Sequence, residues 1–313
     1  MNSRQHLLTI KGPVSIEEFK LVLPHEHIFT DLRGPKHPEY AKADAEHVVS
    51  VMKPYLQSAY DAGVTAIMEC STVGVGRNMD VLEAVAKDTP IHIIAPTGVY
   101  QDDMMPLSYR QYDQAQLSEI FIKELIEGIE DTKIRAGFIK IAMSNDGPTT
   151  LEERNLRAAA NASKKTGAVI ASHSIGGKVA FSQINILENL GINPDRFVWV
   201  HANSETNQNL HLEAARRGVY VEFDAIGAPW EATASQIDST LNLIEAGCAE
   251  RILLSHDAGW YTPAQSSGKP EEFGIRGYTS LVEEFIPSLV DRGVSQELIH
   301  MLTVTNPLRA FAM

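Results

Sequence analysis

Cysteine is scarce in this chain, and long apolar runs are missing. The 313 residues include only Cys70 and Cys248, which form no metal-spaced or redox motif. Such sparse cysteine is typical of a reducing compartment, although the sequence alone leaves one disulfide between the two open. The first residues, MNSRQHLLTIKG, lack an apolar signal core, and no run reaches membrane-spanning length. We therefore expect a cytoplasmic protein with no membrane partner.

Positive charge is also in short supply. The 27 lysines and arginines are outnumbered by 40 aspartates and glutamates, which gives a formal net charge of -13. Nucleic acid and anionic membrane surfaces are therefore not expected partners. The rest of the composition is ordinary for a globular protein, with 44% hydrophobic and 21% charged residues. A chain of this length can bury a large core.

Short apolar runs rich in β-forming residues recur along the chain and alternate with helical patterns. Because these runs are continuously apolar, they indicate parallel strands buried on both faces. Eight strand–helix units predict an α/β fold of the (β/α)8 barrel type. A doubly wound open sheet would carry a glycine-rich phosphate turn after its first strand, where this chain has HEHIF. The runs are KLVLP (20–24), VTAIME (64–69), IHIIAPTG (91–98), AGFIKIAM (136–143), AVIAS (168–172), FVWV (197–200), VYVEF (219–223) and RILLS (251–255).

The predicted organisation is one domain over residues 1–313. Residues 1–19 form an N-terminal hairpin or cap, and residues 20–313 form the barrel. Thr150 and Glu153 are predicted to form a capping box, and Asn306-Pro307 resembles a helix N-cap followed by proline at the first helical position. Helical spacing is found in Ala45–Ala62, Gln114–Ile129, Leu151–Thr166 and Ser235–Ala246.

The tripeptide His25-Glu26-His27 directly follows the first apolar run. In a strand, His25 and His27 share one face and Glu26 takes the other. Two imidazoles at the end of a strand can begin a metal site, but an H-x-H pattern alone also describes two ordinary surface histidines. Further ligands have to come from the rest of the chain.

Residues of the types that bind metals follow other predicted strands. In a (β/α)8 barrel, the residues just past the carboxyl ends of the strands line the active face. Each could by itself be an ordinary loop residue, but their shared placement indicates a metal site. They are Lys140 within the fourth strand, His173 after the fifth, His201 after the sixth and Asp257 after the eighth.

Lys140 is unusual because it lies inside the apolar run GFIKIAM. A bare ammonium there would face a large desolvation cost. One reading pairs the lysine with a buried carboxylate. The other has its neutral amine combined with carbon dioxide as a carbamate, whose two oxygens can bridge two cations. The residues alone leave both readings open.

Taken together, these motifs resemble the phosphotriesterase family of the amidohydrolase superfamily. The resemblance runs from about His25 to the C-terminus and rests on HEH, RAGFIKIA, SHS, VHANSETN, SHD and TVTNPLRAF. It implies two divalent metal ions, with zinc as first choice and manganese, cobalt or iron as alternatives, bridged by an N6-carboxylysine at Lys140. It also implies that one, buried ion is held by His25, His27 and Asp257, and that the more exposed ion is held by His173 and His201.

The implied chemistry is hydrolysis by a hydroxide that bridges the two ions, with Asp257 also accepting a proton as the catalytic residue. We expect a lactone or carboxylic ester as substrate, as in the lactonase and esterase branch, with phosphotriesterase activity as a secondary capacity. Two alternatives are a primary organophosphate triesterase and a non-catalytic protein that binds a hydrophobic ligand. Besides a small-molecule substrate, the expected partner is a second copy of the chain in a homodimer.

The candidate substrate-binding residues are Tyr100, Trp230, Trp260, Tyr261 and Arg276. The last four follow strands seven and eight, where barrel loops form substrate pockets, although the aromatic residues could instead pack the long loop after strand eight. Tyr100 resembles a tyrosine that projects toward the metals in the lactonase branch, or it anchors its loop. Arg276 either recognises a substrate carboxylate or phosphate or is a solvated loop charge.

Three further positions qualify these expectations. Glu26 and His256 adjoin candidate ligands, but neighbouring strand residues point to opposite faces, so both are expected between the barrel and its helices. Ala225 follows strand seven, where the long-chain lactonases that the chain resembles have a larger basic residue. An acyl-homoserine lactone is therefore not the favoured substrate.

Overall fold

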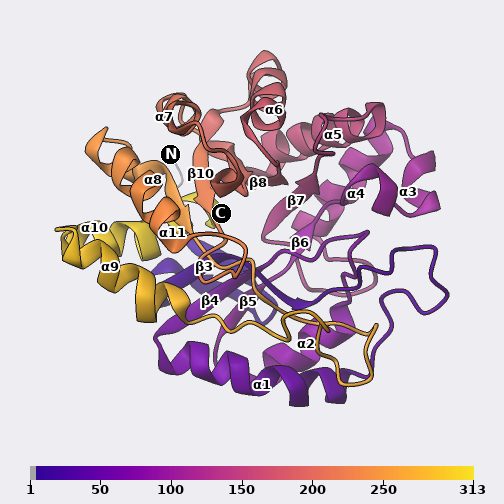
Figure 1. The fold of residues 1–313 in the computed structure, drawn as a ribbon. Coiled ribbons are helices and arrows are strands. Elements are labelled where there is room, and N and C mark those ends of the chain that lie inside the picture. The colour runs from indigo at the N-terminus through magenta and orange to yellow at the C-terminus, as the bar shows by residue number, and fades with distance from the viewer. Residues whose placement is uncertain (1–4) are drawn as a thin grey trace.

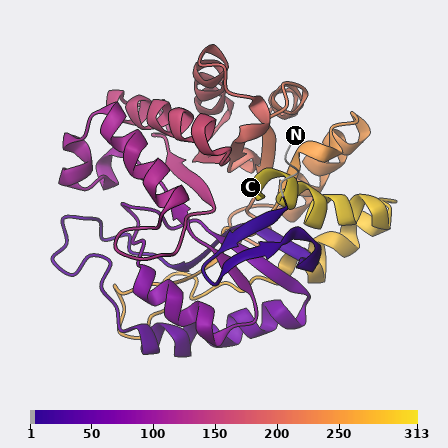
Figure 2. The same ribbon diagram turned by 180° about the vertical axis from the view of Figure 1, so that it is seen from behind.

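A computed structural model describes residues 5–313 of the chain. It begins with the predicted hairpin, in which β1 (His6–Thr9) pairs antiparallel with β2 (Gly12–Ser15). Seen from behind in Figure 2, this indigo hairpin crosses one end of the barrel. The carboxyl end of the chain lies beside it, where the Met313 amide donates to the His6 carbonyl at 3.0 Å.

The (β/α)8 barrel follows, as the sequence predicts (Figure 1). Its strands run parallel in two hydrogen-bonded sets, ordered β11-β10-β9-β8-β7-β6 and β12-β3-β4-β5. The two sets meet at two places. One is in the third barrel strand, which is interrupted between β5 and β6, and the other is in the eighth barrel strand, which is interrupted between β11 and β12. The bounds are β3 (Leu21–Phe29), β4 (Val64–Glu69), β5 (His92–Ile94), β6 (Pro96–Thr97), β7 (Phe138–Ala142), β8 (Ile170–His173), β9 (Phe197–Val200), β10 (Tyr220–Phe223), β11 (Ile252–Leu254) and β12 (Gly259–Tyr261).

Helices form a ring around the strands, visible in both ribbon views (Figures 1 and 2). Two short π-helical stretches, Leu281–Phe285 and Met301–Thr305, lead into α9 and α11. In residues 5–313, no helix is both long enough and apolar enough to cross a membrane. The helices are α1 (Ala45–Asp61), α2 (Met79–Asp88), α3 (Leu107–Gln111), α4 (Gln114–Ile126), α5 (Thr150–Thr166), α6 (Gly177–Asn189), α7 (Gln208–Arg216), α8 (Thr233–Glu245), α9 (Ile286–Asp291), α10 (Gln296–His300) and α11 (Asn306–Phe311).

Two predicted helix caps are wrong in detail. The capping box of α5 joins Thr149 and Glu152, one residue before the predicted pair, because Thr149 keeps the extended backbone of an N-cap. Asn306 is not a cap, since the backbone is already helical before it. Its side-chain amide instead donates to the carbonyls of Ala249 and Ile252.

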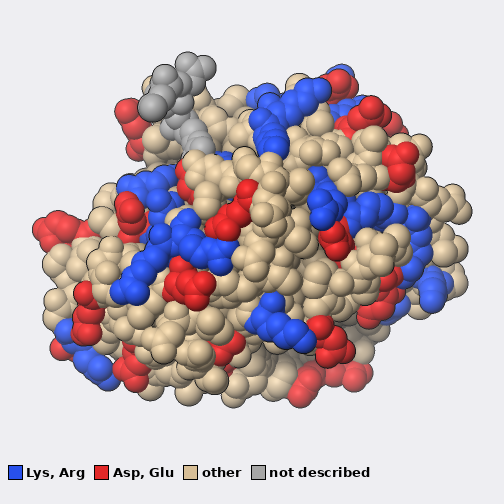
Figure 3. Space-filling model, turned by 90° about the horizontal axis from the view of Figure 1, so that it is seen from above, with Lys and Arg blue, Asp and Glu red and all other residues tan. Residues whose placement is uncertain are grey.

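Alternating side chains divide the strands into an inner and an outer face. In β7, for example, Phe138 packs in the inner core cluster and Ile139 in the outer one. Cys70 and Cys248 are both buried free thiols in the described chain. In the space-filling view from above, lysine and arginine side chains lie among acidic ones rather than in a patch of one sign (Figure 3).

Candidate metal centre

A pocket with an empty volume of about 540 Å³ opens where the strands end. Its wall includes all six predicted metal-ligating residues, which come from five different strands or strand ends. The sequence therefore places these residue types correctly on one face, as the barrel geometry requires. The lining residues are His25, His27, Thr30, Leu32, Val75, Tyr100, Lys140, His173, His201, Asp257 and Trp260.

An irregularity in β3 brings the HEH histidines into this pocket. Val22 belongs to the inner core and Leu23 to the outer one, so strict alternation would turn His25 outward. The pairing of β3 with β4 shifts register between Leu23 and Glu26, as a β-bulge does, and the shift reverses the alternation. His25 and His27 consequently face inward.

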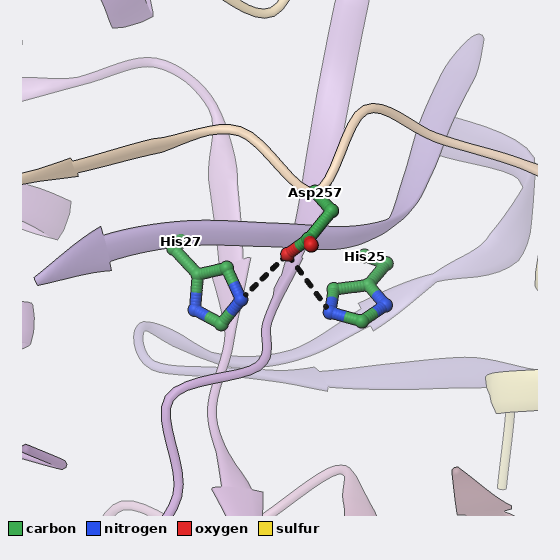
Figure 4. A group of neighbouring side chains, drawn as sticks. All are labelled: His25, His27 and Asp257. Carbon is green, nitrogen blue, oxygen red and sulfur yellow. Dashed lines mark ion pairs between the residues drawn. The ribbon is translucent and has the colours of Figure 1, made fainter. Parts of the chain in front are cut away.

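The Asp257 side chain, which follows β11, points toward His25 and His27 on the first barrel strand, β3 (Figure 4). Its Oδ1 lies 3.0 Å from His27 Nε2 and 3.5 Å from His25 Nε2. Donor atoms of these three residues all fall within 4.8 Å of one another, and so do donor atoms of His25, His201 and Asp224. Mixed imidazole nitrogen and carboxylate oxygen donors suit zinc and the neighbouring divalent transition metals.

Each of three histidines has its Nδ1 held by a polar partner. His25 Nδ1 lies 2.9 Å from Glu222, His27 Nδ1 lies 2.8 Å from Ser71, and His201 Nδ1 lies 2.8 Å from Asp224. With Nδ1 occupied, Nε2 is the nitrogen left to bind a metal, and such partners fix both the tautomer and the ring orientation.

The backbone of His201 is left-handed, with φ of 62°. Val200 packs in the inner core, so a regular continuation of β9 would turn the next side chain outward. The Asp224 carboxylate holds the altered conformation by accepting from both the amide and the Nδ1 of His201, at 2.8 Å each. One carboxylate therefore fixes both the backbone and the ring of this candidate ligand.

Sequence reasoning missed Glu222 and Asp224, which are both fully buried inside the barrel. The signal was present in VYVEFDA, where two acidic residues two positions apart interrupt an apolar strand. Burial and the charge of Asp224 raise the pKa of Glu222 well above its usual range. The pKa of Asp224 is well below its usual range because hydrogen bonds and charge from His201 and His25 outweigh the effect of burial.

The ionisation states of the candidate ligands favour cation binding. Burial, followed by the charge of Lys140, lowers the pKa of His25 to about 3. Burial also lowers the pKa of His173 well below its usual range. Although burial opposes ionisation of Asp257, its hydrogen bond from His27 and the charge of His25 lower its pKa. Neutral imidazoles and an ionised carboxylate are the forms that bind metals.

His201 is the exception among these histidines. Burial works to lower its pKa, but the charge of Asp224 and the hydrogen bond to it raise the pKa above the usual value. This imidazole therefore takes up a proton more readily than His25 or His173 when no cation is present.

Lys140 projects from β7 into the pocket and is 1% exposed. Its Nζ has no hydrogen-bond partner among the described residues. A buried amine without a partner is costly, and the buried carboxylate partner considered above is not found. A carbamate on Nζ would place two anionic oxygens toward the histidines and Asp257. The surroundings of Lys140 thus fit a group that bridges two cations.

Tyr100 and Trp260 line the pocket, as their assignment to substrate binding requires. The Tyr100 hydroxyl lies 3.2 Å from His173 Nδ1, and burial raises the pKa of this phenol. The Trp260 ring meets His27 edge-on, with 5.9 Å between ring centroids. Leu32 and Val75 add apolar side chains to the wall and are not among the predicted site residues.

The other three candidates for substrate binding lie outside the pocket wall. Tyr261 is adjacent to Trp260 on β12 and so takes the opposite face, where it stacks on Phe29 and its hydroxyl meets His47 at 2.9 Å. Its assignment to the substrate pocket is therefore wrong. Trp230 is 53% exposed and lies under the Arg276 guanidinium, 4.7 Å from ring centroid to Cζ.

Arg276 is neither a free recognition group nor a solvated charge. Its guanidinium donates to the backbone carbonyls of His256, at 3.0 Å, and Asp257. Glu26 and His256 face away from the pocket, as predicted. The Nδ1 of His256 donates to Glu26 at 2.6 Å, and its Nε2 accepts from the Leu281 amide at 3.0 Å.

Comparison with known proteins adds the family context. The profile of the phosphotriesterase family matches residues 5–311. The chain is 30% identical over 324 residues to a phosphotriesterase homology protein of Mycobacterium tuberculosis, with 97% of each chain covered. It is 29% identical over 310 residues to an aryldialkylphosphatase of Saccharolobus solfataricus, covering 96% of this chain and 98% of that one.

Solved structures agree with the sequence matches. A mutant of a PTE-like lactonase from Deinococcus radiodurans superimposes with a TM-score of 0.88 at 28% identity, covering 98% of this chain and all of the other. The likeness thus extends over the entire barrel, including the strand ends that carry the pocket.

Proposed function

Because the chain belongs to the phosphotriesterase family and is a metal-dependent hydrolase, we propose that it uses two divalent ions to hydrolyse a lactone or carboxylic ester. The observation that carries the two-ion proposal is the position of Lys140. Its buried Nζ has no hydrogen-bond partner within residues 5–313, and it lies in a pocket wall shared with four histidines and Asp257.

The proposal divides the six candidate ligands between two ions. His25, His27 and Asp257 would hold the buried ion, since their donor atoms already converge. His173 and His201 would hold the more exposed ion, and Lys140, as N6-carboxylysine, would bridge the two. Zinc is the first choice, with manganese, cobalt or iron as alternatives. When bound, the ions would lower the pKa of a shared water and polarise the oxygen of the substrate.

The residues of the chain would supply orientation and proton transfer. The Asp257 carboxylate is low in pKa and faces the pocket, so it can bind a cation through one oxygen and receive a proton through the other. Tyr100, beside His173, would contact the substrate near the ions. Trp260, Leu32 and Val75 would pack against its apolar part and exclude water.

A lactone or carboxylic ester is the first choice because the pocket is modest in volume and its wall away from the ligands is mainly apolar. A planar ester needs one apolar flank, whereas a phosphotriester must place three substituents around phosphorus. The similarity to a PTE-like lactonase supports this choice. The similarity to an aryldialkylphosphatase supports the second candidate, a primary organophosphate triesterase.

Metal analysis of the purified protein, followed by a screen of lactones, aryl esters and phosphotriesters, tests this proposal. We expect two ions per chain and the highest kcat/KM on a lactone or carboxylic ester. Lys140→Met should lose metal and activity together. A highest kcat/KM on phosphotriesters would favour the second candidate, and full activity of the metal-free protein would overturn both.

A further inference from the structure

Asp257 occupies an unusual backbone conformation, with φ of 48° in the left-handed region. This region is unfavourable for residues other than glycine, although aspartate tolerates it better than most. The conformation turns the carboxylate toward His25 and His27 at the seam between the eighth and first strands. Something in the surrounding structure has to hold it, because β11 has already ended at Leu254.

Glu26 binds the backbone amides on either side of Asp257. Its fully buried carboxylate accepts from the amides of His256 and Ala258, at 3.0 Å each, which flank Asp257 on both sides. It also accepts from Ser255 Oγ at 2.8 Å and from His256 Nδ1 at 2.6 Å. The Asp257 amide itself donates to the His25 carbonyl at 3.2 Å. The His27 amide donates in turn to the Ala258 carbonyl at 2.9 Å. The Glu26 side chain thus adds to the backbone bonds that join β3 to this segment.

Arg276 binds backbone carbonyls of the same segment. Its Nη2 donates to the carbonyls of both His256 and Asp257. Arg276 is itself fixed, because its own carbonyl accepts from the Gly259 amide at 3.1 Å and its guanidinium covers Trp230. Glu26 therefore binds the amides on either side of Asp257, and Arg276 binds the carbonyls of Asp257 and of the residue before it.

We propose that Glu26 and Arg276 are positioning residues that hold Asp257 in its ligating conformation. Glu26 lies between His25 and His27 on β3, so one short segment supplies two ligands and also orients a third. This inference rests on the proposed role of Asp257 as a metal ligand. Neither residue belongs to the pocket lining described above.

Glu26→Gln and Arg276→Gln test the proposal, each with a matched control. In Glu26→Gln, the side-chain NH₂ group replaces one carboxylate oxygen and faces N–H groups that also donate. The hydrogen bonds that this oxygen accepted are therefore lost. Glu152→Gln is its control, because the fully buried Glu152 accepts from the amides of Asp102, Ser144 and Thr149, none of which is a proposed metal ligand. Arg154→Gln controls for Arg276, since Arg154 donates to the carbonyls of Arg110, Tyr109 and Tyr112.

The measurement is titration of metal-free full-length protein with Co²⁺, followed by visible absorption and by the melting temperature. For both test variants we expect one of two bound ions to be about tenfold or more weaker, with an altered spectrum, as is usual when a partner of a ligand is removed. Both controls should lower the melting temperature of the metal-free protein without changing Co²⁺ affinity or the spectrum. Test variants that bind both ions like their controls would overturn the inference.

A crystal structure of metal-free Arg276→Gln separates this inference from the proposed function. We expect the Asp257 carboxylate to leave His27 in this variant, and an unchanged φ and side-chain position would overturn the positioning role. That result does not depend on whether the wild-type protein binds metal, whereas a wild-type protein that takes up no Co²⁺ would sink the proposed function. If Glu26→Gln fails to fold, Arg276→Gln still decides the matter, because it alters a partly exposed loop residue.

Discussion

At the residue scale, Asp257 carries two proposed roles, as a ligand and as a proton acceptor. Asn keeps the size and one oxygen donor but removes the charge and basicity of the carboxylate. If Asp257 also moves the proton, Asp257→Asn should lower kcat by about 10²-fold or more while both metals remain. Substrates with good leaving groups should lose least, because their departure needs little protonation. Kinetics on a series of esters, with metal analysis of the variant, measures both effects.

His256→Asn is the comparison for this substitution. His256 lies next to Asp257 in sequence, but its ring meets Glu26 and Leu281 rather than the pocket. We expect its kcat to change far less than that of Asp257→Asn. An equal fall in kcat in the two variants, with metal content intact, would place His256 in the site. It would contradict the structure, in which the His256 ring points away from the pocket.

The response to acid is also decided by single residues. A group whose pKa is raised takes up its proton at higher pH, so protons should compete with metal at His201 before they do so at His25 or His173. His25, with a pKa lowered to about 3, should stay neutral throughout mild acid. As pH falls, the ion held by His173 and His201 should therefore leave first, and activity should fall with it. Metal content and kcat after dialysis at graded pH would show this.

A different result would point to a different cause. If kcat declined at low pH while both ions stayed bound, protonation of the nucleophile rather than of His201 would explain the decline.

At the scale of strands and loops, the sequence predicted which segments carry the candidate ligands that line the pocket, but not how the backbone turns their side chains inward. Alternation within apolar runs located the strands and the side chains that follow them. It could not reveal the β-bulge before Glu26 or the left-handed backbone at His201 and Asp257, because these depend on contacts with distant residues. The same limit explains the error at Tyr261, since the sequence did not show that β12 resumes extended structure after Asp257.

Gly98 packs closely against the backbone of Lys140 on β7. A Cβ on Gly98 would lie 2.0 Å from the Lys140 carbonyl oxygen, and the φ of Gly98 is +118°. Gly147 has nearly the same φ, +122°, but a Cβ there would meet nothing within 4 Å. Backbone strain of about 1–2 kcal/mol should affect both alanine variants, whereas overpacking of about 1–3 kcal/mol or more should add to it only at Gly98.

Urea unfolding of the two variants in metal-free form measures this difference. Gly98→Ala should be the less stable, and it should also bind less metal when ions are restored because Lys140 is displaced. Equal stabilities would show that β7 moves aside at no cost and that Gly98 does not fix Lys140.

At the scale of the whole molecule, the barrel was predictable because eight buried parallel strands leave few other topologies for a chain of this length. The gathering of the six candidate ligands in one pocket was predictable for the same reason, since the carboxyl ends of parallel strands lie on one face. The supporting carboxylates were less predictable. Glu222 and Asp224 lie on the barrel interior, and only the assembled fold shows which histidines they reach.

The state of assembly stays a prediction. We expect a homodimer of one-domain chains, so analytical ultracentrifugation at micromolar concentration should give twice the chain mass. A mass equal to one chain over the full concentration range would contradict the dimer without affecting the proposed chemistry of the pocket.

The proposed function depends on two divalent ions that share a modified Lys140. A high-resolution crystal structure of the metal-loaded protein would show both the ions and the modification. We expect two ions in the pocket, a planar carbamate on Lys140 Nζ with one oxygen toward each ion, and Asp257 bound through one oxygen. A bare Lys140 amine, with a single ion held only by His25, His27 and Asp257, would contradict it.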